Sequence, residues 1–329
     1  MHRRTRRTLW VVAAVLLVLA VALFLRSKAP PEAARLLPDS DGILYVNFKP
    51  IRVFMKKKLK PPKRDPEYQD FVDATGVDWE QDLDQAAVAL HRMQDPKGPN
   101  GPVAYSLVLV GNLTGKKFNA WLESKATSRE SYAGHTIYSI ASQNRVVRVA
   151  QIGYDMIGVS NYPGPEMIRS ILDRHRTAAL PFAGSTLLTE HYHDIPLLSL
   201  AWGVGQIGLP FSESGAIHIL GFALPIQDDS TLIVSAAPTL AHAGSVNLKV
   251  EEIAPSDDAA TSQAATLATL ITMARGFSAP LPANPANEGL KQVLQTAEVN
   301  RKDHRVIVTA SLSQTVLSQF SQAIDADSE

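Results

Sequence analysis

The pattern of apolar and polar positions predicts short strands alternating with helices. Runs rich in β-branched and aromatic residues, bounded by Gly, Asp or Pro, predict strands at 43–48, 103–110, 136–140, 145–150, 155–160, 195–202, 216–224, 231–236, 246–253 and 305–312. Capping residues followed by apolar stripes at helical spacing predict helices that start at Asp65-Pro66, Thr114, Pro165 and Ser256. Gly76 and Gly276 are expected to end the first and the last of these, and 279–287 (APLPANPAN) is expected to be a proline-rich loop. A last helix is predicted to carry Val316, Leu317, Phe320 and Ile324 on one face.

The spacing of these elements favours the α+β class. Many consecutive strands are separated by too few residues for a crossover helix, so the sheets should be antiparallel or mixed. The order of elements repeats, which suggests an internal duplication. The predicted fold is one N-terminal transmembrane helix followed by two tandem sheet units with helices packed on one face. Its predicted boundaries are a basic tail at 1–8, the transmembrane helix at 9–25, a tether at 26–36, and units at 37–180 and 185–325.

The N-terminal segment predicts the location of the chain. The 17 residues of 9–25 (LWVVAAVLLVLAVALFL) carry no charge, which reaches the lower length limit for a membrane-spanning helix. Four arginines precede this run and outnumber the basic residues just behind it. We therefore expect a single-pass inner-membrane protein with a cytoplasmic N-terminus and the bulk of the chain periplasmic or extracytoplasmic.

Two other interpretations of this segment stay open. Ser27 and Ala29 are small enough for a signal-peptide cleavage site, although prolines follow immediately. The run Thr5-Arg6-Arg7-Thr8-Leu9 resembles a twin-arginine export signal, although the stretch after it is very hydrophobic for that route.

Composition excludes several classes of protein. The 329-residue chain contains no cysteine, so disulfides, thiolate nucleophiles and zinc–thiolate sites are impossible. It has 32 basic and 32 acidic residues. Beyond the N-terminal segment, 26 basic residues stand against 32 acidic ones, a net charge of −6. This balance is unsuited to a phosphate backbone, and no nucleic-acid partner is expected.

A glycine motif resembles a dinucleotide-binding fingerprint. Gly203, Gly205 and Gly208 match G-x-G-x-x-G after a predicted strand, and Asp228 lies 20 residues beyond the last glycine. The fingerprint requires a helix whose N-terminus faces the pyrophosphate. Pro210 and the strand expected at 216 leave no room for that helix. We therefore predict no cofactor.

The segment Glu190-His191-Tyr192-His193-Asp194 is the densest set of possible metal ligands. On a strand, His191 and His193 would project to the same face, as a pair of imidazole ligands requires. The alternative is two surface histidines in a loop, because the pair lacks the spacing of known metal sites.

A basic stretch is the most pronounced charge feature. Residues 49–64 (KPIRVFMKKKLKPPKR) contain eight basic residues and no acid. One hypothesis is that this stretch contacts anionic lipid or an anionic polymer. The other is an ordinary solvated segment. The contact hypothesis concerns Lys56, Lys57, Lys58, Lys60, Lys63 and Arg64.

The layout of the chain also resembles a known type of protein. The segments that carry the likeness are LLPDSDGILYVNF, DMIGVSNYPGPEMIRSILDRH, VEEIAPSDDAATSQAATLATLITMARGF and VNRKDHRVIVTASLSQTVLSQF. They resemble uncharacterised bacterial envelope proteins with one N-terminal anchor and a duplicated α+β exterior region. The resemblance covers most of 36–324 and implies no established activity.

The absence of catalytic motifs favours binding over catalysis. No G-x-S-x-G, P-loop, H-E-x-x-H or EF-hand pattern occurs. We expect a membrane-anchored extracytoplasmic binding protein of the bacterial envelope, whose partner is another envelope protein, an anionic lipid or a polymer. The alternatives are an anchored periplasmic hydrolase, whose active site comes together only in the fold, and a purely structural spacer.

Overall fold

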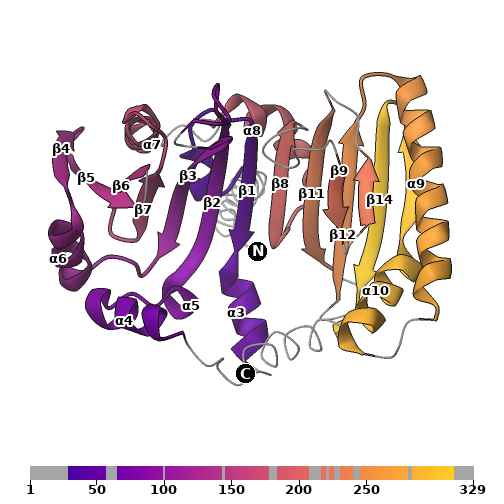
Figure 1. Cartoon of the computed structure of the whole chain (residues 1–329), viewed down its shortest axis with the longest axis horizontal. Coiled ribbons are helices and arrows are strands. Elements are labelled where there is room, and N and C mark those ends of the chain that lie inside the picture. The colour runs from indigo at the N-terminus through magenta and orange to yellow at the C-terminus, as the bar shows by residue number, and fades with distance from the viewer. Residues whose placement is uncertain are drawn as a thin grey trace, which may run out of the picture.

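The computed structural model describes residues 29–56, 65–98, 101–142, 145–177, 184–206, 216–219, 222–225, 230–239, 245–280 and 284–314. In these residues one sheet of 12 strands runs the length of the molecule (Figure 1). Its strand order is β13-β14-β12-β11-β8-β1-β2-β3-β7-β6-β5-β4, and each pair is antiparallel. Strands β9 and β10 form a separate hairpin.

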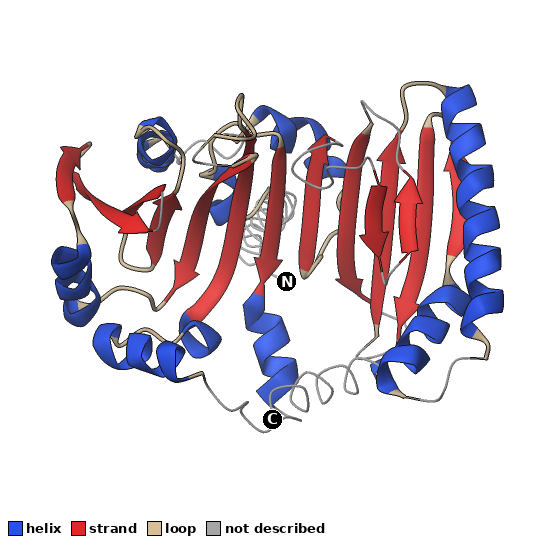
Figure 2. Cartoon of the chain, viewed as in Figure 1, coloured by secondary structure: helices blue, strands red, loops and turns tan. Residues whose placement is uncertain are grey.

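The elements follow one another in this order, and Figure 2 separates helices from strands by colour. The strands of the first half are β1 (Gly42–Asn47), β2 (Leu83–Arg92), β3 (Val103–Gly111), β4 (Ser128–Tyr132), β5 (His135–Ser142), β6 (Arg145–Gln151) and β7 (Met156–Ser160). Those of the second half are β8 (Ala201–Gln206), β9 (Ala216–Ile219), β10 (Phe222–Pro225), β11 (Thr231–Pro238), β12 (Val246–Ile253), β13 (Glu298–Lys302) and β14 (Arg305–Leu312). The helices are α2 (Glu32–Arg35), α3 (Phe48–Lys56), α4 (Pro66–Thr75), α5 (Trp79–Asp82), α6 (Lys116–Lys125), α7 (Glu166–Arg176), α8 (Thr186–His191), the 3₁₀ helix η1 (Tyr192–Asp194), α9 (Asp257–Ser278) and α10 (Pro285–Thr296).

Several helix boundaries follow from local capping chemistry and confirm the sequence predictions. Asp65 accepts a hydrogen bond from the backbone N–H of Glu67 at the start of α4, and Gly76 ends that helix in the left-handed conformation at φ 71°. Ser256 caps α9 by accepting from the N–H of Ala259 at 3.2 Å.

Other local predictions are wrong. Thr114 does not cap α6: the helix begins after Gly115, and the Thr114 hydroxyl donates to the carbonyl of Tyr154 instead. Helix α9 continues past Gly276 to Ser278. The strand predicted at 195–202 is β8 at Ala201–Gln206, because Pro196 has no N–H for a ladder and its carbonyl closes a turn with Ser199.

Helices cover both faces of the large sheet. Successive strand residues point to opposite faces, and Val108 and Leu109 of β3 belong to two different cores. Val108 shares its core with α2, α7 and α8, and we call that side the α7 face. Leu109 packs with α6 on the opposite side of the sheet. The strand register from β3 to β14 places Val306 on that side too, where it packs under α9. We call this side the α9 face.

The predicted fold class is therefore wrong in its arrangement, although the α+β composition is correct. The two expected sheets are one continuous sheet, and the helices pack on both faces rather than one. The two halves share only a coarse order of elements. In the first, β1, β2 and β3 are followed by α6 and a four-stranded meander, β4 to β7, whose last strand pairs with β3. In the second, β8, β11 and β12 are followed by α9, α10 and the hairpin of β13 and β14, whose last strand pairs with β12. The duplication itself, with its boundaries at 37–180 and 185–325, stays a prediction.

No N-terminal transmembrane helix is shown in the part of the chain that the structure describes. The segment predicted to span the membrane, 9–25, lies outside the described residues. Among the helices that the structure does describe, none combines the length and the apolar character that crossing a bilayer requires.

The two halves meet where β1 pairs with β8. The register joins Leu44 to Gly203 and Tyr45 to Trp202, whose rings stack at 5.3 Å between centroids. A Cβ at position 203 would lie 2.6 Å from Cδ2 of Leu44 and 3.1 Å from Cγ2 of Val234. Glycine at this position lets the side chains of both neighbouring strands close over the middle of the sheet.

Gly111 provides a test of this backbone packing. It adopts φ 156°, and an added Cβ would overlap the carbonyl oxygen of Asp82. We expect Gly111→Ala to lower the free energy of unfolding by about 1–3 kcal/mol, measured by urea denaturation. Gly276→Ala is the matched control, because nothing lies within 4 Å of its added Cβ. That change should raise stability by about 0.5–1 kcal/mol. Equal effects at the two positions would contradict this account.

Candidate functional site

The predicted metal ligands lie on helices rather than on a strand. Ser185 caps α8 by accepting from the N–H of Leu188, so His191 ends this helix and His193 lies in η1. The premise that both imidazoles share one face of a strand therefore fails. The His193 side chain is 70% exposed, whereas that of His191 is 18% exposed.

A cluster of charged side chains lies beside these histidines, against the α7 face. Arg305 of β14 donates from Nη1 to Asp194 at 2.7 Å and to Glu251 of β12 at 2.6 Å. Lys249 forms a second ion pair with Glu251, whose side chain is only 3% exposed. These two carboxylates raise the pKa of Arg305 above its ordinary value, Glu251 more than Asp194.

This cluster is better suited to its own ion pairs than to a metal. Nδ1 of His191 lies 3.9 Å from Asp194, and Nε2 of His193 lies 3.4 Å from it. The guanidinium of Arg305 already binds the Asp194 carboxylate. Its positive charge would repel a metal cation bound at the same carboxylate. Among the residues that the structure describes, no group of three or more His, Asp or Glu side chains is arranged to hold a metal ion. Metal binding by His191 and His193 stays a prediction without structural support.

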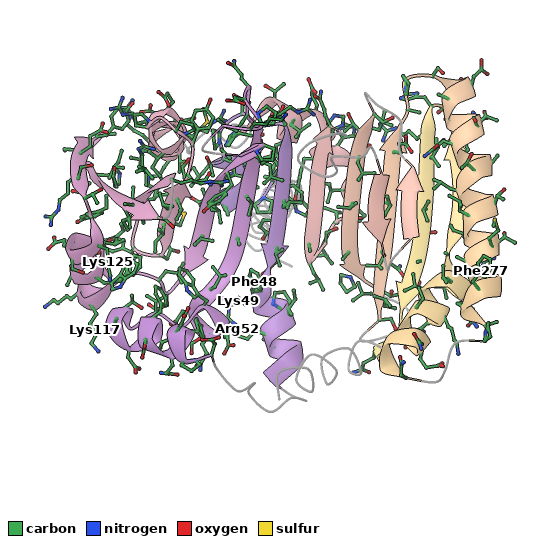
Figure 3. All side chains as sticks on the ribbon, viewed as in Figure 1. Phe48, Lys49, Arg52, Lys117, Lys125 and Phe277 are labelled. Carbon is green, nitrogen blue, oxygen red and sulfur yellow. The ribbon has the colours of Figure 1, made fainter. Side chains whose placement is uncertain are left out.

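The basic stretch begins against an acidic part of the chain. Arg52 of α3, which is labelled in Figure 3, donates to Asp84 at 3.0 Å and to the carbonyls of Gln81 and Leu83. Lys49 lies 3.7 Å from the same Asp84. The first two basic residues of the stretch therefore attach α3 to the sheet.

The residues of the contact hypothesis are not placed by the structure. Lys56 ends α3, and its side chain is not described. The others, Lys57, Lys58, Lys60, Lys63 and Arg64, lie outside the described residues. Contact of this stretch with an anionic lipid or polymer stays a prediction.

The first two glycines of the glycine motif lie inside the sheet, whereas Gly208 lies outside the described residues. Gly203 and Gly205 are both residues of β8, paired with β1 on one side and β11 on the other. A phosphate-binding turn requires free backbone N–H groups between a strand and a helix. These two glycines are strand residues. The close packing of Leu44 and Val234 around Gly203 explains why a glycine is present at that position.

A buried serine–histidine network has no signal in the sequence. Nε2 of His91 on β2 lies 3.0 Å from Oγ of Ser106 on β3, which lies 3.0 Å from Oγ of Ser160 on β7. Burial lowers the pKa of His91, while nearby Asp41 and a hydrogen bond to the backbone of Asp39 act in the opposite direction. Ser106 and Ser160 are 0% exposed, so no substrate reaches either hydroxyl.

A surface groove of about 360 Å³ lies between α6, the strands β5 and β6, and the loop before β7. None of its side chains is a carboxylate, lysine or arginine. Three carry an amide or an aliphatic hydroxyl, two are tyrosines, and one is a histidine. The lining residues are Asn119, Gly134, His135, Thr136, Tyr138, Gln151, Ile152, Gly153 and Tyr154.

The loop that carries Tyr154 is held by its backbone while the ring faces solvent. Thr114 donates to the carbonyl of Tyr154, and Gly111 N–H donates to that of Asp155 at 2.8 Å. The Gln151 side chain donates to the carbonyl of Gly153 at 3.0 Å. Tyr154 is nevertheless 96% exposed. An aromatic ring held in water by a fixed loop is a common feature of binding surfaces.

The comparisons with known proteins leave the family open. No family model matches the chain, and no curated protein matches it. Crystal forms III, I and IV of TP0453 are similar at TM-scores of 0.45, 0.40 and 0.41 and identities of 10%, 11% and 12%. The alignments cover 90%, 91% and 90% of this chain and 99%, 98% and 98% of those chains. Such values support no inference about function, and the resemblance to envelope proteins stays a prediction.

The buried His91 predicts a pH dependence of stability. Because its pKa in the folded state is below the ordinary value of 6.5, the unfolded chain takes up the proton first as pH falls. The His91 contribution should be constant above about pH 6.5 and should reduce stability as pH falls from there to the lowered folded pKa. The measurement is the unfolding free energy of the wild type minus that of His91→Gln from pH 8 to pH 4.5. A difference that stays flat over this range would contradict the prediction.

The Arg305 bridge predicts a large cost for its removal. Arg305→Met leaves Asp194 and Glu251 facing each other without the guanidinium, and we expect a loss of about 3 kcal/mol of unfolding free energy. Arg305→Lys keeps the charge but lacks the planar group that reaches both carboxylates, so it should recover only part of the loss. Urea denaturation at pH 7 measures both variants, and a Met variant as stable as the wild type would show that the bridge contributes nothing.

Proposed function

We propose that this protein is an extracytoplasmic binding protein of the bacterial envelope that contacts a neutral, N-acetylated glycan through the groove between α6, β5 and β6. The observation that carries the proposal is the lining of that groove, where neutral hydrogen-bonding side chains lie beside the exposed ring of Tyr154. The proposed function acts by contact rather than by catalysis.

The chemistry of the lining supports this class of ligand. Asn119 and Gln151 each have an amide with both donor and acceptor groups, which complements an acetamido group. Thr136 and Tyr138 have hydroxyls that exchange hydrogen bonds with sugar hydroxyls. The ring of Tyr154 presents an apolar surface on which the C–H face of a sugar ring can stack. A charged ligand would find no opposite charge from a carboxylate, lysine or arginine in this lining.

The hydrolase alternative has less support. The nearest arrangement to a nucleophile and base is Ser106 with His91, and both lie inside the sheet layer. A catalytic hydroxyl has to reach the substrate carbonyl or phosphate directly. Since Ser106 and Ser160 are completely buried, this network is a stabilising polar contact between strands.

The test is the binding of a soluble N-acetylglucosamine oligomer to the full-length chain in non-ionic detergent, measured by isothermal titration calorimetry. We expect Tyr154→Ala to weaken binding at least tenfold, about 1.4 kcal/mol, because it removes the stacking surface. Tyr154→Phe keeps the ring and should stay within about threefold of the wild type, about 0.6 kcal/mol.

Phe277→Ala is the matched control, because Phe277 is also an exposed aromatic residue, at 68%, but lies on α9 at the other end of the sheet (Figure 3). It should bind the oligomer like the wild type. The proposal fails if the oligomer does not bind, or if Tyr154→Ala binds it as well as the wild type does.

A further inference from the structure

The charged side chains of the two edge strands of the 12-stranded sheet differ in whether they contact other residues of the chain. At the edge strand β4, Glu130 pairs with Arg169 of α7, and Arg129 lies over the ring of Tyr138. At the opposite edge strand β13, Glu298 and Lys302 are both exposed, and in the part of the chain that the structure describes neither forms an ion pair. The outer edge of β13 pairs with no described strand, so its outward N–H and C=O groups are available to another chain.

The sequence of β13 is complementary to itself in the antiparallel direction. With Asn300 opposite Asn300 of a second copy, Glu298 of one strand lies opposite Lys302 of the other, on both sides of the axis. Opposite charges in directly facing positions stabilise an antiparallel pair, whereas like charges destabilise it. The register of β13 on β14 places Glu298, Asn300 and Lys302 on the α7 face, away from α9.

An exposed apolar stripe on α9 lies beside the same edge. Helix α9 packs on β13 and β14, and Arg275 donates to the carbonyls of Leu294 and Ala297 at the end of α10. Met273 and Phe277 are each two residues from Arg275, roughly opposite to it around the helix. They therefore point away from α10, and they are 52% and 68% exposed.

The outer surface of α9 is also unusual in its lack of charge. Between Asp258 and Arg275 the helix carries no charged residue, although most of its outward positions are exposed. A helix face turned to bulk water ordinarily carries charged residues. The uncharged surface, the Met273–Phe277 stripe and the unpaired strand edge thus occur together at one end of the molecule (Figure 3).

We propose that this end binds a second copy of the same chain. In the pair, β13 of each copy joins the other in antiparallel register centred on Asn300, which extends one sheet through two molecules. A two-fold axis perpendicular to the sheet places both α9 helices on the same side of it, with their Met273 and Phe277 side chains facing each other. Such a contact is isologous and closes at two copies.

The first experiment uses the absence of cysteine from the chain. Asn300→Cys in the full-length protein, in non-ionic detergent, should form a disulfide-linked dimer under mild oxidation, because the two cysteines face each other across the axis. Ser131→Cys is the matched control, an exposed position in the other edge strand. We expect at least tenfold more cross-linked dimer from Asn300→Cys, and equal cross-linking of the two variants would overturn the proposal.

The second experiment tests the register by exchanging charges. Glu298→Lys and Lys302→Glu each place like charges opposite one another, and each should raise the dimer dissociation constant at least tenfold in sedimentation equilibrium. The double variant Glu298→Lys with Lys302→Glu restores opposite charges and should return the constant to within about threefold of the wild type. A monomeric wild type, or a double variant no better than the single ones, would overturn the proposal. Tyr154→Ala should leave the dimer intact, so a failure of the proposed glycan site is distinguishable from a failure of the dimer.

Discussion

The pairing of β1 with β8 is the interaction on which the rest of the structure depends. It joins the two halves of the chain through five residue pairs and turns them into a single sheet. Side chains on both faces stabilise it: Tyr45 stacks on Trp202 on the α7 face, and Leu44 closes over Gly203 on the α9 face. Loss of this contact would expose two apolar sheet edges at once and separate the core that α2, α7 and α8 share with both halves.

The continuous sheet also determines where the charged cluster and the surface groove lie. Its centre is covered on the α7 face by short helices, while α6 and α9 cover opposite ends of the α9 face. The charged cluster around Arg305 lies where the covering helices of the α7 face end, at η1. The groove beside Tyr154 and the exposed stripe of α9 lie at opposite ends of the sheet. The continuous sheet thus separates the proposed glycan surface from the proposed self-association surface, so that occupation of one would leave the other accessible.

Helix boundaries that depend on a few neighbouring residues could be predicted from the sequence, whereas strands that depend on pairing with distant strands could not. Asp65-Pro66 and Gly76 bound α4 because capping and positive φ depend on a few neighbouring residues. By contrast, β2 (LDQAAVALHR) and β13 (EVNRK) were not predicted: the first is rich in alanine and the second is short and polar. Helix α10 begins inside a proline-rich segment predicted as a loop, because Asn284 caps it and Pro285 fits its first turn.

The candidate sites show the same limit. The pair His191 and His193 was interpreted on strand periodicity, but a serine cap six residues before His191 makes the segment helical and separates the two imidazoles. The contact between His91 and Ser106 depends on how β2 pairs with β3, which no local pattern specifies. Tyr154 is one tyrosine among eight in the sequence, and only the fold shows that its loop holds the ring in solvent.

The position of β8 in the chain has a consequence for the order of synthesis. Strand β1 obtains its first partner, β2, early, but its other edge stays open until the ribosome has added the residues from Asn47 to Ala201. At about 5–20 residues per second this takes roughly 10–30 s. During that interval the uncharged segment Gly42–Asn47 is an apolar template for strands of other nascent chains. The second half of the chain therefore does more than add its own strands, because its first strand closes the open edge that the first half leaves in the middle of the sheet.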